Sequence, residues 1–249
     1  MIRTENLSVV YRGGIVALHP LSLNLNEGEF TVLLGSSGAG KSTLLKCLNG
    51  LAKPTQGNVV AEGLGDLKDP KVLREHRKRT GTIYQQHQLI PRQTALKNVL
   101  ISRVAYHSTW RSFWPLPKKD HYIALECLDR VGLLDKALVR VDRLSGGQQQ
   151  RVGISRALAQ QPRMVLADEP VASLDPTSSH YVLSLLRKIC KNDGISAVVS
   201  LHQVELATEY ADRIVGISEG QIVFDGTPAA AAQKIDQIYS TGVTETNAT

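Results

Sequence analysis

Short, fully apolar runs and amphipathic stretches follow one another along most of the chain. The run FTVLL at 30–34 lies between polar segments, and MVLA at 164–167 and SAVVSL at 196–201 have the same character. Short runs rich in β-branched residues predict strands of a buried parallel sheet. With the alternating and charged stretches included, the pattern predicts strands over 2–11, 17–25, 30–34, 58–62, 81–84, 164–167, 196–201, 214–218 and 221–225, and helices over 41–48 and 69–79.

The middle of the chain has a different pattern. From about residue 88 to residue 160 the apolar positions follow a helical period, and β-branched runs are sparse. Strands that alternate with helices on either side of this stretch predict an α/β fold with a mainly parallel sheet. We therefore expect a single domain over 1–249. Residues 1–87 and 161–240 would form an α/β core with a β-subdomain, and residues 88–160 a helical subdomain.

The composition is that of a globular protein. Hydrophobic residues make up 42% of the 249 residues and charged residues 21%, which excludes a disordered chain or a disulfide scaffold. No apolar run reaches the roughly 18–20 residues that cross a bilayer, and the first residues lack the pattern of a secretory signal. Three scattered cysteines predict buried thiols in a reducing compartment. The net charge of +6 is compatible with nucleic acid, an anionic membrane or a phosphate ligand.

A glycine-rich segment joins the strand at 30–34 to the helix at 41–48. Its sequence, GSSGAGKST, fits the phosphate-binding pattern G-x-x-x-x-G-K-[ST]. The glycines let backbone N–H groups point at phosphate oxygens, and the helix N-terminus adds the positive end of its dipole. We expect Lys41 to reach the β- and γ-phosphates and the Ser42 hydroxyl to bind Mg²⁺. The nucleotide-binding residues expected here are Gly35, Ser36, Ser37, Gly38, Ala39, Gly40, Lys41, Ser42 and Thr43.

An acidic pair, Asp168 and Glu169, follows the apolar run at 164–167. A parallel strand that ends in carboxylates places them at the carboxyl edge of the sheet, beside the phosphate loop. Asp168 suits the Mg²⁺ shell, and Glu169 could polarise an attacking water as a general base. Taken alone, the pair is also typical of a strand that ends in solvated acids, so its meaning depends on the phosphate loop.

A third segment, LSGGQ at 144–148, repeats the design of an anion site. A hydroxyl and two glycine N–H groups stand at the start of a predicted helix, in the residues Ser145, Gly146, Gly147 and Gln148. The chain thus has two phosphate-binding devices about a hundred residues apart. This separation indicates a nucleotide shared between two copies.

Together these motifs resemble the nucleotide-binding subunit of an ABC transporter, over about residues 1–240. LSGGQ is the signature of that superfamily, and here it lies between the phosphate loop and the acidic pair. The resemblance implies a P-loop NTPase (RecA-like) core with a mainly parallel sheet, an N-terminal antiparallel β-subdomain and an α-helical subdomain insertion. It also implies ATP and Mg²⁺ as the bound nucleotide and ion.

The same resemblance assigns roles to further residues. Tyr11 would stack on adenine, and Gln85 would contact Mg²⁺ and water, with the adjacent Gln86 as the alternative register. Asp175, in the segment SLD, would communicate across a dimer, and His202 would meet the γ-phosphate. The expected catalytic set is Lys41, Gln85, Glu169 and His202, and the expected metal ligands are Ser42, Gln85 and Asp168. Ser145 and Gly147 would act on the nucleotide of the partner copy.

The resemblance also implies partners. We expect a homodimer docked under two integral membrane permease subunits on the cytoplasmic face of the (inner) membrane, served indirectly by an external substrate-binding protein. Segments 85–92 and 108–114, the latter with Trp110 and Trp114, resemble phosphonate-import ATPases and predict uptake of phosphonate or phosphite. The alternatives are import of polar amino acids, lipoprotein-type export and a soluble protein that acts on nucleic acid. For the importer subunit that we expect, no nucleic acid is a partner. The basic stretch 71–79 is a solvated face or a lipid-headgroup contact.

Overall fold

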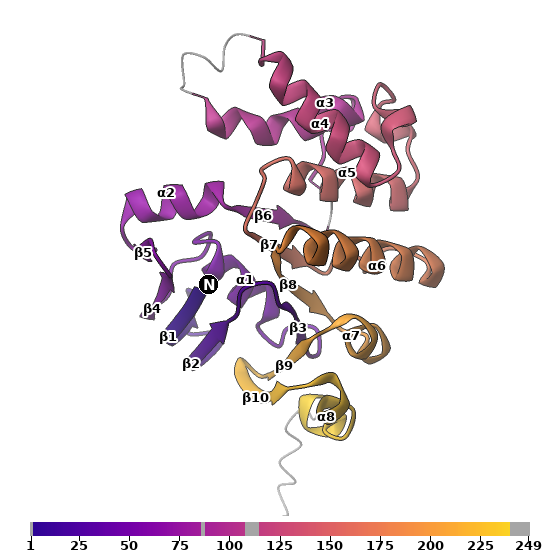
Figure 1. Cartoon of the computed structure of the whole chain (residues 1–249). Coiled ribbons are helices and arrows are strands. Elements are labelled where there is room, and N and C mark those ends of the chain that lie inside the picture. The colour runs from indigo at the N-terminus through magenta and orange to yellow at the C-terminus, as the bar shows by residue number, and fades with distance from the viewer. Residues whose placement is uncertain (1, 86–87, 108–114, 240–249) are drawn as a thin grey trace, which may run out of the picture.

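The computed structural model describes residues 2–85, 88–107 and 115–239, and within them two sheets organise the chain (Figure 1). One sheet has the strand order β2-β1-β4-β5, and the other the order β10-β9-β3-β8-β7-β6. The strands of the first sheet are β1 (Ile2–Val10), β2 (Val16–Leu25), β4 (Gln56–Ala61) and β5 (Gly65–Asp66). Those of the second are β3 (Phe30–Leu34), β6 (Thr80–Ile83), β7 (Met164–Asp168), β8 (Ser196–Leu201), β9 (Arg213–Ser218) and β10 (Gln221–Gly226).

The six-stranded sheet is parallel except at one edge. The pairs β3–β8, β3–β9, β7–β8 and β6–β7 are all parallel, whereas β10 pairs with β9 in the antiparallel sense. Every residue of β3 and β8 is buried, as expected for strands covered by helices on both faces. The predicted α/β fold with a mainly parallel sheet is therefore confirmed, as is the antiparallel pairing of the N-terminal strands.

Helices cover the sheets and form a separate group beyond β6. Around the strands lie α1 (Lys41–Leu48), α2 (Pro70–Lys78), α6 (Pro176–Asp193), α7 (Val204–Tyr210), α8 (Pro228–Ala232) and α9 (Ile235–Tyr239). The group beyond β6 consists of α3 (Ala95–Leu100), η1 (Ile101–Tyr106), α4 (Lys118–Arg130), η3 (Leu134–Lys136), η4 (Val141–Arg143) and α5 (Gly146–Leu158). Figure 1 shows α3, α4 and α5 together at one end of the molecule.

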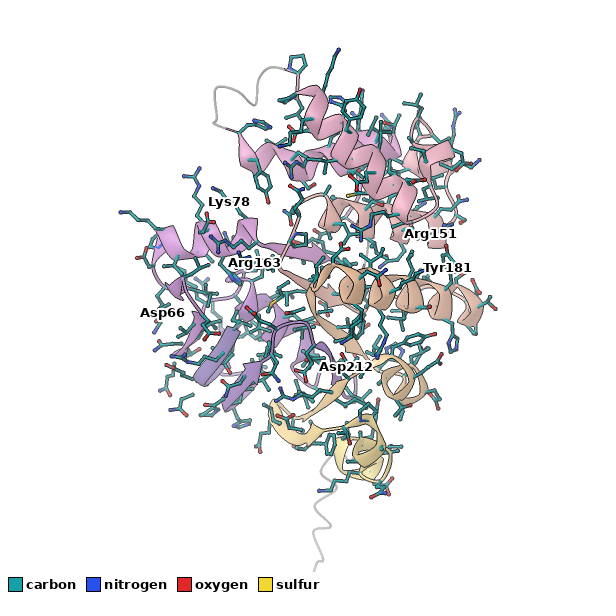
Figure 2. The ribbon with its side chains drawn as sticks, in the orientation of Figure 1. Asp66, Lys78, Arg151, Arg163, Tyr181 and Asp212 are labelled. Carbon is teal, nitrogen blue, oxygen red and sulfur yellow. The ribbon has the colours of Figure 1, made fainter. Side chains whose placement is uncertain are left out.

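The helix α5 connects this helical group to the sheet. It packs against α3 and α4 on one side and against β6 and α6 on the other. Arg151 of α5 lies with its guanidinium 5.3 Å from the ring centroid of Tyr181 on α6 (Figure 2), at a distance that permits a cation–π attraction. The start of α5 is therefore held at a fixed place beside α6.

The predicted elements match the structure with small shifts at their ends. The strand predicted at 58–62 occupies Gln56–Ala61, and the first strand ends at Val10, so that Tyr11 lies in the turn beyond it. The predicted hairpin at Glu219 and Gly220 is present, with both residues at positive φ, as a tight two-residue turn requires. Trp110, Trp114 and Gln86 lie outside the described residues.

The basic stretch at 71–79 forms α2, and part of it packs against the end of α1. His76 is buried with Nε2 2.8 Å from the Leu48 carbonyl oxygen, and Arg77 donates to the carbonyls of Asn49 and Gly50. Side-chain donors near a helix C-terminus satisfy its free carbonyls, and burial lowers the pKa of His76. His76 therefore serves the fold, whereas Arg77 remains exposed while it donates to the carbonyls at the end of α1.

A buried ion pair joins η1 to α4 in the helical group. Arg103 Nε donates to Asp120 Oδ1 at 2.8 Å, and His107 Nε2 lies 2.6 Å from Asp120 Oδ2. Arg103 also donates to the Ala159 carbonyl, beyond the end of α5. Burial alone would raise the pKa of the Asp120 carboxyl, but the hydrogen bonds and charges of Arg103 and His107 bring it below its ordinary value.

We expect Asp120→Asn to destabilise the protein by about 3–5 kcal/mol at pH 7, because it leaves the Arg103 charge buried without its counter-ion. A carboxyl whose pKa is lowered on folding stabilises the fold above its unfolded-state pKa of about 4, and this contribution is lost as the pH falls through the lower folded-state value. The gap between wild type and variant should therefore narrow below pH 4. Urea denaturation at pH 7 and at pH 3.5 measures both, and an equal gap at the two pH values would contradict the account.

The three cysteines are buried free thiols, as the sequence predicts. Cys47, Cys127 and Cys190 are free and buried, and burial raises the pKa of the first two to about 11 and of Cys190 to about 12. Such thiols are poor nucleophiles. In the part of the chain that the structure describes, no helix combines the length and apolar character that a bilayer crossing requires.

Candidate functional site

Strand register brings the predicted residues to one edge of the six-stranded sheet. Leu34, the last residue of β3, pairs with Leu201 of β8, and Asp168 of β7 pairs with Ser200 of β8. Ile83, the last residue of β6, pairs with Ala167. Since all four strands are parallel, the segments that follow them leave the sheet together. These segments carry the phosphate loop, His202, Glu169 and Gln85.

The loop after β3 turns tightly between its neighbours. A Cβ at Gly35 would lie 2.1 Å from the Ile217 carbonyl oxygen, so no larger residue fits there. Gly40, the residue before α1, has φ +105°, and a Cβ there would lie 2.7 Å from the Ala17 carbonyl oxygen. Both positions require glycine, and the loop is thereby fixed at the N-terminus of α1 with its backbone free to approach an anion.

Lys41, the first residue of α1, is buried at the base of this loop. Its Nζ donates to the carbonyl oxygens of Gly35 and Ser36, both at 2.8 Å. Burial lowers the pKa of the ammonium group, and the nearby Glu169 and Asp168 carboxylates act in the opposite direction. The amine therefore stands inside the loop, next to the acidic pair.

Asp168 receives hydroxyl hydrogen bonds from both sides. Ser42 Oγ donates to Asp168 Oδ1 at 2.8 Å, and Ser200 Oγ donates to the same oxygen at 2.9 Å. The Ser42 contact joins two residues that are 126 positions apart in the sequence. It places a hydroxyl and a carboxylate, both hard oxygen donors, side by side at the mouth of the phosphate loop.

Glu169 adopts an unusual backbone conformation directly after β7. Its φ is +45°, a left-handed conformation that costs a residue with a Cβ roughly 1 kcal/mol or more. The Glu169 N–H donates to Ser200 Oγ at 2.8 Å, and the Glu169 Oε2 accepts a hydrogen bond from Gln85 Nε2 at 3.1 Å. This turn directs the carboxylate toward the segment that follows β6, where Gln85 lies.

Two other predicted residues reach the site from more distant segments. Tyr11, 43% exposed, lies with its hydroxyl 3.2 Å from Thr43 Oγ1 on α1, so an exposed aromatic ring stands next to the phosphate loop. His202 is exposed just beyond β8, and its backbone carbonyl accepts a 2.6 Å hydrogen bond from the Tyr239 hydroxyl. The C-terminal helix α9 thus contacts the segment that carries His202.

The signature segment lies at the start of α5 and makes local hydrogen bonds. Ser145 and Gln148 form a reciprocal capping box that satisfies the first backbone groups of this helix. A Cβ at Gly147 would lie 3.6 Å from Ser178, so the segment packs beside the start of α6. There Asp175 is the N-cap of α6 and accepts from the Ser178 N–H at 2.9 Å. The structure therefore brings the signature segment and Asp175 together, at the starts of α5 and α6.

Sequence reasoning missed two residues of this site, Ser200 and Tyr239. Ser200 is hidden within the apolar run SAVVSL, and only the register of β7 against β8 places it beside the acidic pair. Tyr239 lies beyond the last predicted strand, and nothing in its local sequence indicates that α9 returns to His202. Within the described ranges, no group of three or more His, Cys, Asp or Glu residues could hold a metal ion by itself.

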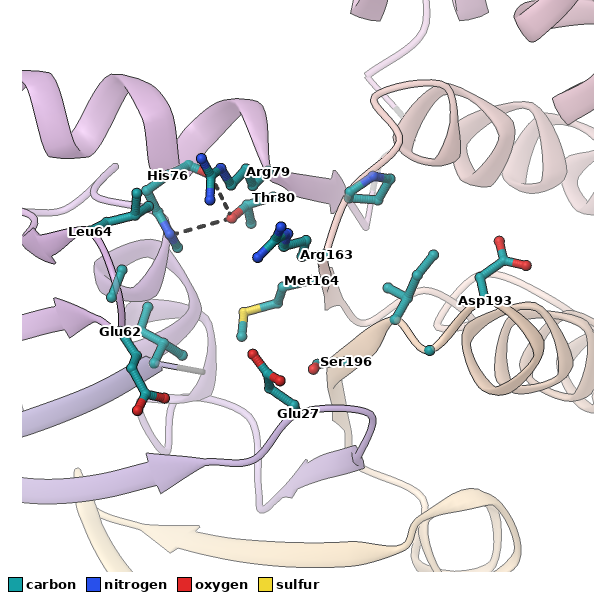
Figure 3. Close-up of a pocket in the computed structure, with 15 residues that line it drawn as sticks. Glu27, Glu62, Leu64, His76, Arg79, Thr80, Arg163, Met164, Asp193 and Ser196 are labelled. Carbon is teal, nitrogen blue, oxygen red and sulfur yellow. Dashed lines mark hydrogen bonds between the residues drawn. The ribbon is translucent and has the colours of Figure 1, made fainter.

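A cavity of about 310 Å³ lies at the opposite edge of the sheet, where the strands begin (Figure 3). Thr80, Met164 and Ser196, the first residues of β6, β7 and β8, line it together with the arginine side chains of Arg79 and Arg163. Figure 3 shows the hydrogen bonds of Thr80 to His76. The phosphate loop and the acidic pair lie at the other end of these strands, so this cavity is separate from the candidate site.

A groove beside the acidic pair runs between the sheet and the helical group. One part, of about 530 Å³, is lined by Leu51, Tyr84, Gln85 and Asp168 among others. A second part, of about 360 Å³, shares Leu51 and Tyr84 and extends to Ile101 of η1. Leu51 is 52% exposed and Ile101 is 43% exposed. The groove thus presents exposed apolar side chains next to a candidate catalytic group.

Comparison with known proteins identifies the family of this chain. The family described as ABC transporter matches residues 18–172. A phosphonates import ATP-binding protein of a Nostoc species is 69% identical over 240 residues, which cover 96% of this chain and 92% of that protein. A phosphite import ATP-binding protein of Stutzerimonas stutzeri is 61% identical over 241 residues, which cover 96% of this chain and 87% of that protein.

Solved structures give the same result. A post-hydrolysis dimer of an ATP-binding cassette bound to ADP and Pi superposes with a TM-score of 0.79 at 35% identity, over 92% of this chain and 99% of that one. A nucleotide-free ATP-binding cassette from an ABC transporter gives a TM-score of 0.84 at 28% identity, over 97% of this chain and 99% of that one. These matches confirm the expected P-loop NTPase fold, and the chain belongs to the ABC transporter family.

Proposed function

We propose that this chain is the ATP-hydrolysing subunit of an importer for phosphonate or phosphite. The observation that carries the ATPase assignment is the meeting of Ser42, Asp168 and Glu169 at one sheet edge, next to the phosphate loop. The substrate class is supported by relatives at 69% and 61% identity, whose names specify phosphonates and phosphite import.

The phosphate loop would hold the triphosphate of ATP. Its backbone N–H groups and the N-terminus of α1 provide an anion site, and the Lys41 amine, now on the Gly35 and Ser36 carbonyls, would turn to the β- and γ-phosphates. The exposed ring of Tyr11 beside Thr43 would stack on the adenine base. Segment 35–43 and Tyr11 together would therefore fix both ends of the nucleotide.

The oxygen donors near the loop fit Mg²⁺. Ser42 and Asp168 offer a hydroxyl and a carboxylate 2.8 Å apart, and Mg²⁺ takes its other ligands from phosphate oxygens and water. Gln85, whose Nε2 donates a hydrogen bond to Glu169 Oε2 at 3.1 Å, is the third protein group placed to approach the ion or its water. The bound ion would neutralise charge that develops on the phosphates.

Glu169 would act as the general base. Its carboxylate lies beyond the end of β7, and the hydrogen bond from Gln85 orients it. A carboxylate in this position accepts a proton from a water that attacks the γ-phosphate, a step worth about 10²–10⁴-fold in rate. His202, which directly follows the neighbouring strand β8, would donate a hydrogen bond to the γ-phosphate oxygens as negative charge accumulates there.

Two copies of the chain would complete the site. Ser145, Gly146 and Gly147 form a second anion-binding helix start, yet the hydrogen bonds of Ser145 are local and the two glycines lie beside Leu174 and Ser178 at the start of α6. The signature is therefore available to a nucleotide held by another copy. The dimeric cassette that contains ADP and Pi supports this arrangement.

The partner in the membrane would occupy the groove between the sheet and the helical group. Leu51 and Ile101 expose apolar surface there, and Gln85 lines the same groove while its amide contacts Glu169. A permease helix seated in this groove would touch the segment that orients the general base. Hydrolysis and transport would thereby be linked on the cytoplasmic face of the membrane.

Growth of a strain that lacks this chain tests the proposed substrate class. The deletion strain is grown with a phosphonate, with phosphite or with phosphate as the sole phosphorus source. We expect loss of growth on a phosphonate or on phosphite, rescue by the wild-type chain, and normal growth on phosphate. Normal uptake of both radiolabelled compounds by the deletion strain would contradict the substrate assignment and leave the ATPase assignment intact.

A further inference from the structure

We propose that Ser200 is a positioning residue that aligns the metal-binding and proton-accepting carboxylates of this ATPase. Its hydroxyl donates to Asp168 Oδ1 at 2.9 Å and accepts from the Glu169 N–H at 2.8 Å. A serine hydroxyl has a single hydrogen to donate, and here Asp168 accepts it while the serine oxygen accepts from the Glu169 N–H. Both hydrogen bonds of the hydroxyl are therefore made with the acidic pair. The proposal rests on the roles assigned to Asp168 and Glu169 above.

The position of Ser200 follows from the sheet. Ser200 pairs with Asp168 in the parallel register of β8 against β7, and it is completely buried. Neighbouring side chains in this register lie on the same face of the sheet. The other residues of β8 between Ala197 and Leu201 are apolar, so Ser200 supplies a lone hydroxyl at the end of an apolar run.

The hydroxyl acts on two features that chemistry requires. Asp168 Oδ1 receives both Ser42 and Ser200, so Ser200 keeps the carboxylate oriented when the Ser42 hydroxyl turns to another ligand. Glu169 starts from a left-handed φ of +45°, and the bond to its N–H holds this conformation. Without Ser200 both carboxylates are free to rotate, and a small displacement of a reacting group is costly in rate.

Ser196 provides a matched control on the same strand. It is also buried, and its hydroxyl accepts from the Gly28 N–H at 2.9 Å, at the end of β8 away from the acidic pair. Ser196→Ala therefore removes a buried serine hydrogen bond of the same kind without touching the site. Ser200→Thr keeps a hydroxyl at the site and serves as the conservative variant.

The test is steady-state ATPase kinetics of the full chain. We expect Ser200→Ala to lower kcat about 10- to 100-fold, with KM for ATP within about twofold because the phosphate loop is intact. Ser196→Ala should keep kcat near that of the wild type, and Ser200→Thr should recover much of the lost rate. The thermal midpoints of Ser200→Ala and Ser196→Ala should be similar. A Ser200→Ala kcat equal to that of Ser196→Ala would overturn the proposal.

Two measurements in a Glu169→Gln background separate positioning from general structural damage. In single-turnover assays, adding Ser200→Ala should lower the residual rate by a smaller factor than it lowers the rate of the wild type, because the part of its effect that passes through Glu169 is already lost and only the part through Asp168 remains. In size-exclusion runs with ATP and Mg²⁺, the double variant should form as much dimer as Glu169→Gln alone. Full additivity of the rate losses, or loss of the dimer, would overturn the proposal. If Glu169→Gln is itself as active as the wild type, the assigned role of Glu169 fails, which is a separate result.

Discussion

Glu169→Gln should slow ATP hydrolysis by about 10²–10⁴-fold and at the same time accumulate an ATP-bound dimer. Glutamine keeps the size of the side chain and can still contact Gln85, but its amide cannot accept the proton of the attacking water. The phosphate loop and Lys41 are unchanged, so ATP binding should persist. Because ATP would join the two copies and hydrolysis would release them, a block at the chemical step should collect the closed form.

Two measurements check this prediction. Phosphate release gives kcat, and size-exclusion with light scattering in ATP and Mg²⁺ gives the mass, which should double for Glu169→Gln. The control is Glu126→Gln, an exposed position on α4 in the helical group, which should hydrolyse ATP as the wild type does. A monomer at every ATP concentration, together with an unchanged kcat, would remove Glu169 from the mechanism.

Lys41→Ala should lower kcat/KM by at least about 10²–10³-fold. The side chain is buried inside the loop, with 3% of its surface exposed, and no other lysine or arginine donates to the loop carbonyls among the described contacts. Removing this cation takes away a charge that would face the phosphates in a site of low dielectric, where one well-placed donor contributes about 10²–10³-fold.

The loss should include nucleotide affinity, unlike the loss in Glu169→Gln. Fluorescent ATP-analogue titration measures the dissociation constant, and phosphate release measures turnover in the same preparation. The exposed Lys53 supplies a control, since Lys53→Ala removes a positive charge at a surface position in the loop after α1. Lys41→Ala with the affinity and turnover of the wild type would refute the phosphate-loop assignment.

Much of the site could be predicted because its residues lie in short, recognisable sequence motifs. The turn from FTVLL through GSSGAGKST to a helix requires glycine at position 35, where a Cβ would lie only 2.1 Å from the Ile217 carbonyl oxygen. The strand MVLA followed by Asp168 and Glu169 is equally local. These segments combine strand propensity, turn chemistry and a helix start within about fifteen residues, and each of those signals is short-range.

What could not be predicted depends on contacts between distant segments. Ser200 looks like one more residue of a buried strand until the register of β8 places it opposite Asp168. The contact between Tyr239 and the His202 carbonyl joins segments 37 residues apart across α7, β9, β10 and α8. His76 and Arg77 belong to one basic stretch in the sequence, although His76 is buried against the Leu48 carbonyl and Arg77 donates to the Asn49 carbonyl at the end of α1. Hydrophobic periodicity predicts which face of a helix or strand is buried, but it does not predict which other segment packs against that face.

We infer that each ATP is held by the phosphate loop of one copy and the signature of another, and mixing two inactive variants tests this arrangement. Lys41→Ala has an intact signature, and Ser145→Arg has an intact phosphate loop. Each is purified, shown to be folded by circular dichroism and assayed alone. A mixed dimer restores one complete site, so we expect the mixture to hydrolyse ATP well above the sum of the two separate rates. A mixture no more active than that sum, with both variants folded and able to associate, would show that the signature does not act on the nucleotide of another copy.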